Sequence, residues 1–290
     1  MKVHFAGSEG SDIFDSALYV AEIHYRLYSC YKYIVNKNVG DDFRLPKNDT
    51  IITQCQKMRH VIQDSGLFTL MFGAGAGEEQ SYETMINWQD KLIEFVKQND
   101  LNSTCVELDC QKLLGVKEAW KLRERMKNKL PNRQINVWHV EDGKSGLDSL
   151  VDFSDYIAIS VPELRKEMGS KHKENTKRLA YYIKSRKPEI DIHLLGCTDF
   201  SMMKENKFCT SCDSTSWLQG VKYGFIGDGK IKSHVRNFDR ELVLQREQEC
   251  RDYLAKRGIE IKPKTLRYTA NASISASICK QRYEKILGEQ

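Results

Sequence analysis

The stretch that decides the fold is Val61-Ile62-Gln63-Asp64-Ser65-Gly66-Leu67-Phe68, in which a short apolar strand runs into a carboxylate and a Ser-Gly turn. In a parallel α/β fold, the loops that follow the carboxyl ends of the strands form the functional face. An Asp at such a strand end is therefore a better candidate for chemistry than an Asp in the middle of a helix. Asp-Ser-Gly is also an ordinary turn sequence, so the stretch gains weight only because the chain repeats this design.

Similar apolar segments recur along the chain, and several of them run into polar or acidic residues. The expected strands are Lys2–Ala6, 60–63, 103–109, 135–140, 156–161, 190–196 and 207–212, with an eighth strand or an inserted hairpin within 223–231. The expected helices are 14–36, 78–99, Val116–Lys129, 163–187, 240–258 and 273–287. Strands that alternate with helices in this way predict a (β/α)8 barrel before a doubly wound open sheet.

The composition favours one large domain. Hydrophobic residues make up 40% of the 290 positions and charged residues 29%, which is enough to bury a sizeable core. The chain has only five Pro and no low-complexity tract, so no linker is expected. We therefore predict a single barrel domain over 1–290, with the barrel itself at about 1–235 and a helical tail at about 236–290.

Charge and cysteine content indicate which partners the protein could bind and in which compartment it is expected. The formal net charge is +5, which is compatible with an anionic partner. The nine Cys show no framework spacing, and the chain opens on a strand-like segment rather than a signal peptide, so free thiols in a reducing cytosol are expected. No run of about 18 apolar residues occurs, so no membrane span is expected.

A barrel would bring the polar strand ends together, namely Asp64, Asp109, His139 and Asp213. One carboxylate could attack a sugar anomeric carbon while a second, roughly 5 Å away, moves protons. A third could accept hydrogen bonds from a base, on which Phe68 would stack. The same set could instead bind Mg²⁺. The glycines of 73–77 do not form a dinucleotide fingerprint, and a lid or a plain loop is expected there.

Four short motifs resemble those of the tRNA-guanine transglycosylase family. Gln63–Phe68 is similar to its Asp-Ser-Gly-Gly-Phe/Tyr-Gln motif, and Leu108-Asp109-Cys110 to its Phe-Asp-Glu-Cys. His193-Leu194-Leu195-Gly196 is similar to its Tyr-Leu-Met-Gly, and Ser211-Cys212-Asp213 stands in the place of its nucleophile. The order and spacing of these motifs agree from about residue 1 to 235.

The resemblance implies a role for each matching residue. Asp213 would be the nucleophile and Asp64 the acid/base residue, and Asp109 would read the guanine edge. The residues expected to surround the base are Ser65, Gly66, Phe68, Leu195 and Gly196. His139 is the favoured match for a further base contact after the fourth expected strand, with Glu141 and Asp142 as alternatives.

Two features of the family are missing. The Cys-x-Cys-x-x-Cys and His zinc pattern does not follow Asp213, and the nearby Cys209 and Cys212 form a lone pair whose spacing is more often chance. No added RNA-binding domain is expected after the barrel. We therefore expect no metal or other cofactor.

A compact, zinc-poor chain with Cys-Asp-Ser-Thr-Ser-Trp resembles the DNA-acting branch, the phage and bacterial 7-deazaguanine transglycosylases. The resemblance implies exchange of guanine in DNA for a 7-deazaguanine such as 7-cyano-7-deazaguanine, on a nucleotide flipped out of the stack. The basic helical stretches 117–129 and 165–187 are the candidate phosphate contacts, with Lys121, Arg125 and Lys129 singled out.

Three alternatives stay open. The first is guanine exchange in tRNA. The second is a non-catalytic nucleic-acid-binding barrel subunit, which would be expected to lack the nucleophile. The third is a metal-dependent barrel hydrolase, which would need more His residues at the strand ends.

Overall fold

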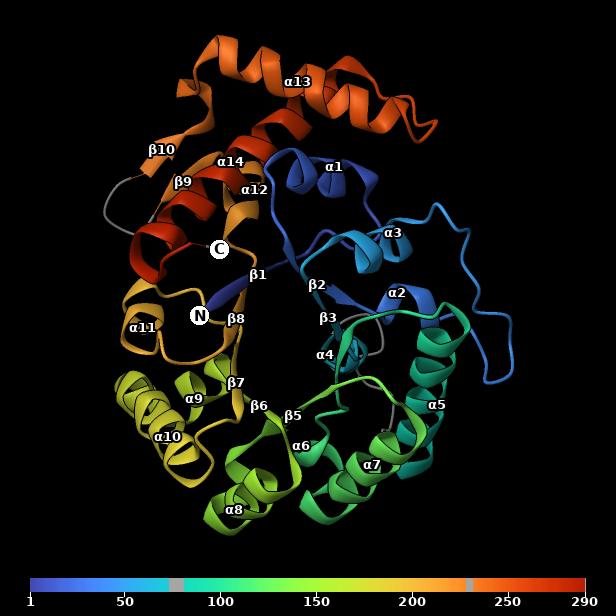
Figure 1. Ribbon diagram of the computed structural model, residues 1–290, viewed down its shortest axis with the longest axis vertical. Coiled ribbons are helices and arrows are strands. Elements are labelled where there is room, and N and C mark those ends of the chain that lie inside the picture. Colours follow the sequence, from blue (N-terminus) through green and yellow to red (C-terminus); the bar gives the residue numbers. More distant parts are fainter. Residues whose placement is uncertain (73–80, 228–231, 290) are drawn as a thin grey trace.

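The computed structural model describes residues 1–72, 81–227 and 232–289. Its parallel strands form a closed barrel, in which each strand pairs with the next and the last pairs with the first (Figure 1). The barrel strands are β1 (Lys2–Ala6), β2 (Tyr25–Ser29), β3 (His60–Asp64), β4 (Thr104–Val106), β5 (Gln134–Trp138), β6 (Tyr156–Ser160), β7 (Asp191–Leu195) and β8 (Ser211–Ser214). The predicted (β/α)8 barrel is confirmed.

Helices surround the barrel on its outside (Figure 1). They are α1 (Asp12–Val20), α2 (Tyr31–Ile34), α3 (Thr50–Lys57), α4 (Leu67–Phe72), α5 (Tyr82–Gln98), α6 (Gln111–Leu114), α7 (Val116–Lys129), α8 (Gly143–Phe153), α9 (Val161–Met168), α10 (His172–Arg186), α11 (Phe200–Glu205), α12 (Gln219–Tyr223), α13 (Arg240–Ala255) and α14 (Pro263–Leu287). Two large apolar clusters fill the space between strands and helices, and a smaller one fills part of the barrel interior.

The predicted helix over 14–36 is wrong, because a barrel strand lies within it. The helix ends at Val20, and Glu22 then takes a left-handed φ of 53°. In β2, Leu27 belongs to the interior cluster and Tyr28 to an outer cluster, which is the alternation of a strand. Arg26 on the outer side is fully buried and donates from Nε to the Ile23 carbonyl at 3.0 Å.

The segment 223–231 does not supply a barrel strand. Of the two predicted alternatives, the inserted hairpin is the correct one: β9 (Phe225–Gly227) pairs antiparallel with β10 (Lys232–His234), apart from the barrel. The residues 228–231 lie outside the described part of the chain. The last barrel strand also starts later than predicted, so Asp213 lies within β8 rather than after its end.

The C-terminal helices pack onto the barrel beside α1 (Figure 1). Trp217 links the two parts, since its indole donates to the Ala6 carbonyl at 2.9 Å while its own carbonyl accepts from Ser275 of α14 at 2.6 Å. Tyr283 of α14 also donates to Ser214 of β8. In the described part of the chain, no helix has the length and apolar character needed to cross a membrane.

A buried ion pair ties α7 to the barrel wall. Arg123 and Glu107 each keep only 2% of their side chains exposed, and their closest nitrogen and oxygen atoms lie 2.7 Å apart. The Glu107 carboxylate also accepts from Asn136 at 2.6 Å and from the Val137 N–H at 2.8 Å. Its charge is therefore compensated on all sides, and removing the arginine would leave it buried without its cation.

We expect Arg123→Ala to lower the free energy of unfolding by about 3–5 kcal/mol, because it leaves the Glu107 carboxylate buried in the core without its counter-ion. Urea unfolding followed by circular dichroism measures this. Lys117→Ala on the exposed side of the same helix is the matched control, with an expected change within about 0.5 kcal/mol. Equal effects of the two substitutions would show that the pair does not hold α7 in place.

Candidate functional site

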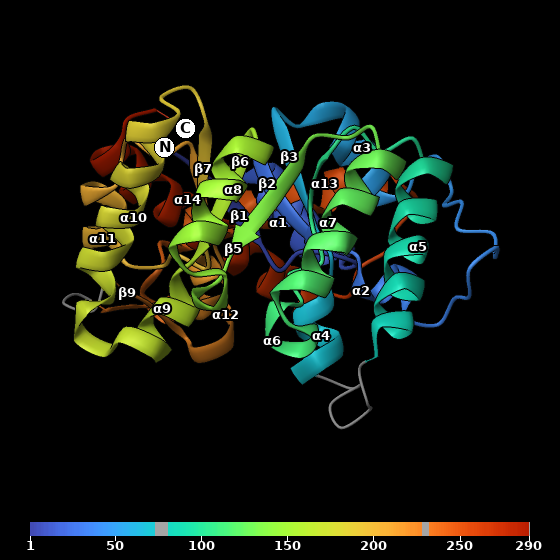
Figure 2. The same cartoon turned by 90° about the horizontal axis from the view of Figure 1, so that it is seen from below.

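The polar strand ends meet at the C-terminal end of the barrel. Figure 2 shows the barrel from the side, with α4, α6 and α12 at the end toward which β5 points. Asp64 is the last residue of β3 and Asp213 lies in β8. Asp109 and His139 follow β4 and β5, and the His139 Nε2 atom lies 3.5 Å from the Asp109 carboxylate. The predicted convergence of these four side chains is thus found at one end of the fold.

Asp64 is held by the turn that follows its strand. Its Oδ1 atom accepts the Gly66 N–H at 2.8 Å. Gly66 has a φ of 74°, and an added Cβ would lie 2.8 Å from the Tyr31 backbone nitrogen. Only glycine can adopt this left-handed φ and also fit this close to the Tyr31 backbone without strain. The Ser-Gly turn of the sequence is therefore the local cause of the carboxylate's position.

Asp213 is held in the same manner by a different turn. Its Oδ1 atom accepts the Gly196 N–H at 2.7 Å and lies 3.2 Å from Nε2 of His193. Gly196 has a φ of 61°, and an added Cβ would lie 2.8 Å from Cγ of Pro162. The Asp213 side chain remains 13% exposed, so it can be reached from the end of the barrel.

The neighbouring acids change the protonation of Asp64. Burial raises the pKa of Asp64, the Gly66 N–H partly offsets this, and the negative charges of Asp109 and Asp213 raise it further, to about 7. The residue is therefore present as both acid and carboxylate near neutral pH, which suits a group that gives and takes a proton. The charges of Asp109 and Asp213 thus act on Asp64, as expected for acids at the same end of a barrel.

A cation balances the acidic cluster on the side of β5. Nδ1 of His139 lies 2.8 Å from Glu163 of α9, and Nζ of Lys112 lies 3.0 Å from the other oxygen of that carboxylate. Burial disfavours the protonated ring, but Asp109 and Glu163 outweigh burial and raise the pKa of His139 to about 10. Burial likewise raises the pKa of Glu163, yet His139 and Lys112 hold it below its usual value.

The other predicted base contacts differ in their surroundings. Leu195, at the end of β7, is half-buried and packs against the apolar cluster inside the barrel. Ser65 is only 1% exposed; its hydroxyl accepts the Leu67 N–H at 3.4 Å and its carbonyl accepts from Trp88 at 2.9 Å. Ser65 therefore stabilises the turn from inside the wall, and a direct contact between its hydroxyl and a base is not supported.

Two predictions near this end of the barrel fall outside what the structure describes. The backbone of Phe68 belongs to α4, but its side chain is not described, so the predicted stacking on a base stays a prediction. The glycines of 73–77, predicted as a lid or a loop, also lie outside the described residues.

The cations predicted to contact phosphate lie on α7, along the outer wall of the barrel. Arg125 and Lys129 both pair with Asp90 of α5, at 2.5 and 3.1 Å, and Lys121 pairs with Glu118 at 2.9 Å. Because these charges are already compensated, their contact with nucleic acid stays a prediction without structural support.

A second basic group, within the other stretch predicted to contact phosphate, follows a residue of the candidate site in the sequence. Arg165, Lys166 and Lys171 follow the site residue Glu163 in the chain, on α9 and the turn after it, and all three are exposed. Within the described residues, none of the three forms an ion pair with a carboxylate.

Several site residues were missed in the sequence. The sequence pattern places Glu163 only at the start of an expected helix, 163–187, although it comes just after an apolar strand. His193 was used only as part of a motif, and Lys112 was not singled out. The signal that could have found Glu163 is its place just after Pro162, which ends the expected strand 156–161.

His139, Glu141 and Glu163 have ligand atoms within 4.8 Å of one another, a spacing that a metal ion could use. Lys112, however, lies 3.0 Å from Glu163 and 3.9 Å from Glu141. A metal ion would have to displace this ammonium group and the proton of His139. The group is therefore better described as an ion-pair network.

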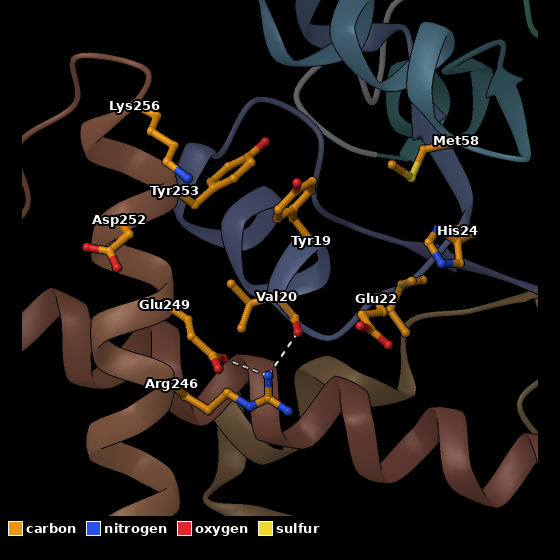
Figure 3. Close-up of a pocket in the computed structure, with 11 residues that line it drawn as sticks. Tyr19, Val20, Glu22, His24, Met58, Arg246, Glu249, Asp252, Tyr253 and Lys256 are labelled. Atoms are coloured by element: carbon orange, nitrogen blue, oxygen red, sulfur yellow. Dashed lines mark hydrogen bonds and ion pairs between the residues drawn. The ribbon is translucent and has the colours of Figure 1, made fainter.

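A separate pocket of about 580 Å³ lies at the opposite end of the barrel, between the α1–β2 turn and α13 (Figure 3). Its arginine, Arg246, donates to the Val20 carbonyl at 2.9 Å and pairs with Glu249 at 2.8 Å (Figure 3). None of the predicted site residues is among the residues that line it.

Comparison with known proteins adds no assignment: no protein-family model matches this sequence, and no curated protein matches it.

We expect the stabilising effect of His139 to disappear in alkaline solution. The folded protein keeps the His139 proton up to about pH 10, whereas an unfolded chain loses it near pH 6.5. Between these values the folded state binds more protons, so the contribution is complete below about pH 6.5 and is lost as the pH rises toward about 10. The difference in unfolding free energy between wild type and His139→Gln, measured across this range, should shrink accordingly.

His172→Gln is the control for this titration, since His172 pairs with no carboxylate among the described residues. A difference between wild type and His139→Gln that stays constant across the range would show that His139 is not held as a cation.

Proposed function

We propose that this protein exchanges guanine in DNA for a 7-deazaguanine base through a covalent intermediate between Asp213 and the sugar. The observation that carries the proposal is the pair of glycine-held carboxylates, Asp64 and Asp213, coupled electrostatically at one end of the barrel. A nucleophile and a proton-transfer group in one environment are what a retaining exchange at an anomeric carbon requires.

The reaction uses the two acids in turn. Asp213 attacks C1′ of the flipped deoxyguanosine, and the bond from C1′ to N9 breaks while protonated Asp64 gives its proton to the departing guanine. The resulting Asp64 carboxylate then removes the N9 proton of the incoming base. That N9 attacks C1′, the ester bond to Asp213 breaks, and Asp64 is again protonated. A pKa of about 7 for Asp64 serves both halves of this cycle.

Asp109 and His139 suit the edge of a guanine. The Asp109 carboxylate can accept hydrogen bonds from the N1–H and the 2-amino group, as carboxylates do with base amino groups. The protonated His139 ring gives its Nδ1–H to Glu163 at 2.8 Å, so its Nε2–H, 3.5 Å from Asp109, is the donor that a guanine O6 could share. Charge-assisted donors of this kind are strong. The arrangement makes no use of N7, which is consistent with acceptance of a 7-deaza base.

We expect Asp213→Ala to abolish both base exchange and the covalent adduct, because it removes the attacking oxygen. Release of labelled guanine from a DNA oligonucleotide, and a DNA–protein band that survives denaturing electrophoresis, measure the two steps. A parallel arm with tRNA tests the alternative substrate. Asp152→Ala is the control: its carboxylate is 74% exposed on α8 and should not affect either readout. An adduct that persists in Asp213→Ala would refute the assignment of the nucleophile.

We expect the exposed cations of α9 and its following turn to contribute more to DNA binding than those of α7. Changing Arg165, Lys166 and Lys171 to Gln should reduce the slope of log affinity against log salt by about 0.9 for each phosphate that the protein no longer neutralises. The matched triple change of Lys121, Arg125 and Lys129 should alter the slope less, because two of these charges are paired with Asp90. The reverse ranking would place the DNA on the outer wall.

A further inference from the structure

A chain of buried polar groups lies inside the barrel beneath Asp213. The His193 side chain is fully buried, with Nε2 at 3.2 Å from Oδ1 of Asp213 and Nδ1 at 2.5 Å from the hydroxyl of Ser211. The Ser211 hydroxyl in turn lies 2.5 Å from the hydroxyl of Tyr156. Barrel interiors of this class are filled mainly by branched apolar side chains, so polar residues beneath a candidate nucleophile need a reason.

For an ionised Asp213 and a neutral His193 ring, the hydrogen-bonding capacity of these groups gives one consistent direction for their protons. An ionised Asp213 can only accept, so Nε2 of His193 must carry a proton and donate it. In the neutral ring, Nδ1 is then an acceptor, which the Ser211 hydroxyl can satisfy as a donor. Tyr156 then donates to the free lone pair of Ser211. Every member of the chain is satisfied in this arrangement.

The two donors to Asp213 converge on a single oxygen. Both the Gly196 N–H and His193 approach Oδ1. Within the described residues, no donor is hydrogen-bonded to Oδ2. One oxygen is therefore anchored while the other stays available for attack, in a geometry that the rigid strands β7 and β8 maintain.

We propose that His193 is a positioning residue for the nucleophile: its Nε2–H holds Oδ1 of Asp213 and so aims Oδ2 at the anomeric carbon, while Ser211 and Tyr156 satisfy the Nδ1 side of the ring. This inference rests on the proposed base exchange. His193 touches neither the base nor the sugar in this scheme, and it acts only through Asp213.

The kinetic test compares two substitutions of His193. His193→Leu removes the donor and should slow formation of the DNA–protein adduct by about 10- to 100-fold, the loss expected for one hydrogen bond to a charged group. The affinity for free base should not change, because Asp109 and His139 are untouched. His193→Gln keeps an N–H donor and an acceptor and should recover most of the rate.

His60→Gln is the matched control. His60 also lies in the barrel interior, where it is hydrogen-bonded to His4 and Thr104, each at 2.8 Å, rather than to Asp213. Its substitution should perturb stability without slowing the adduct step. Equal slowing by His60→Gln, or wild-type rates in His193→Leu, would overturn the positioning role.

A spectroscopic test separates this inference from the proposed function. In protein labelled with ¹⁵N-histidine, the His193 signals should show a protonated Nε2 and an unprotonated Nδ1 in mildly alkaline solution, and Asp213→Asn should shift the Nε2 signal. The opposite tautomer would overturn the inference. If wild type shows the expected tautomer but exchanges no base, the proposed function fails while the contact between His193 and Asp213 stands.

Discussion

Two backbone N–H groups, those of Gly66 and Gly196, hold the carboxylates on which the site depends. Each glycine has a left-handed φ in the turn after a strand, and each is packed so closely that a side chain would collide with its neighbour. Each N–H is donated to one acid, Asp64 or Asp213. Asp64 is held by the turn after its own strand, and Asp213 by the turn after the neighbouring strand β7. Closure of the barrel brings these two acids, 149 positions apart, to one end.

Gathering acids at one end of a barrel is electrostatically unfavourable, and the structure compensates for it in two ways. The ring of His139, held between Asp109 and Glu163, supplies a positive charge that Lys112 extends. Asp64 instead retains its proton to an unusually high pH, because burial and its acidic neighbours disfavour the carboxylate. As a result, Asp64 can gain or lose a proton near neutral pH, and Asp213 is anchored by two hydrogen-bond donors.

The sequence predicted the barrel and the meeting of its polar strand ends, because strand-then-carboxylate segments are local patterns. It failed where the decisive partners are remote. The strand β2 was not apparent because its outward residues Arg26 and Tyr28 are polar, and the partners that satisfy them, the Ile23 carbonyl and Asp15, are seen only in the folded chain. The pairing of Arg125 with Asp90 joins two helices, and the contact of His193 with Asp213 joins two strands. Neither contact can be predicted from a single stretch of sequence.

The most direct measurement of the central claim is the titration of the Asp64 carboxyl carbon by ¹³C NMR, in wild type and in Asp213→Asn. Two acids that share one environment predict a wild-type midpoint of about 7, and a lower midpoint once the charge at position 213 is removed. A wild-type midpoint in the ordinary range of aspartate, or one that does not respond to Asp213→Asn, would contradict the account.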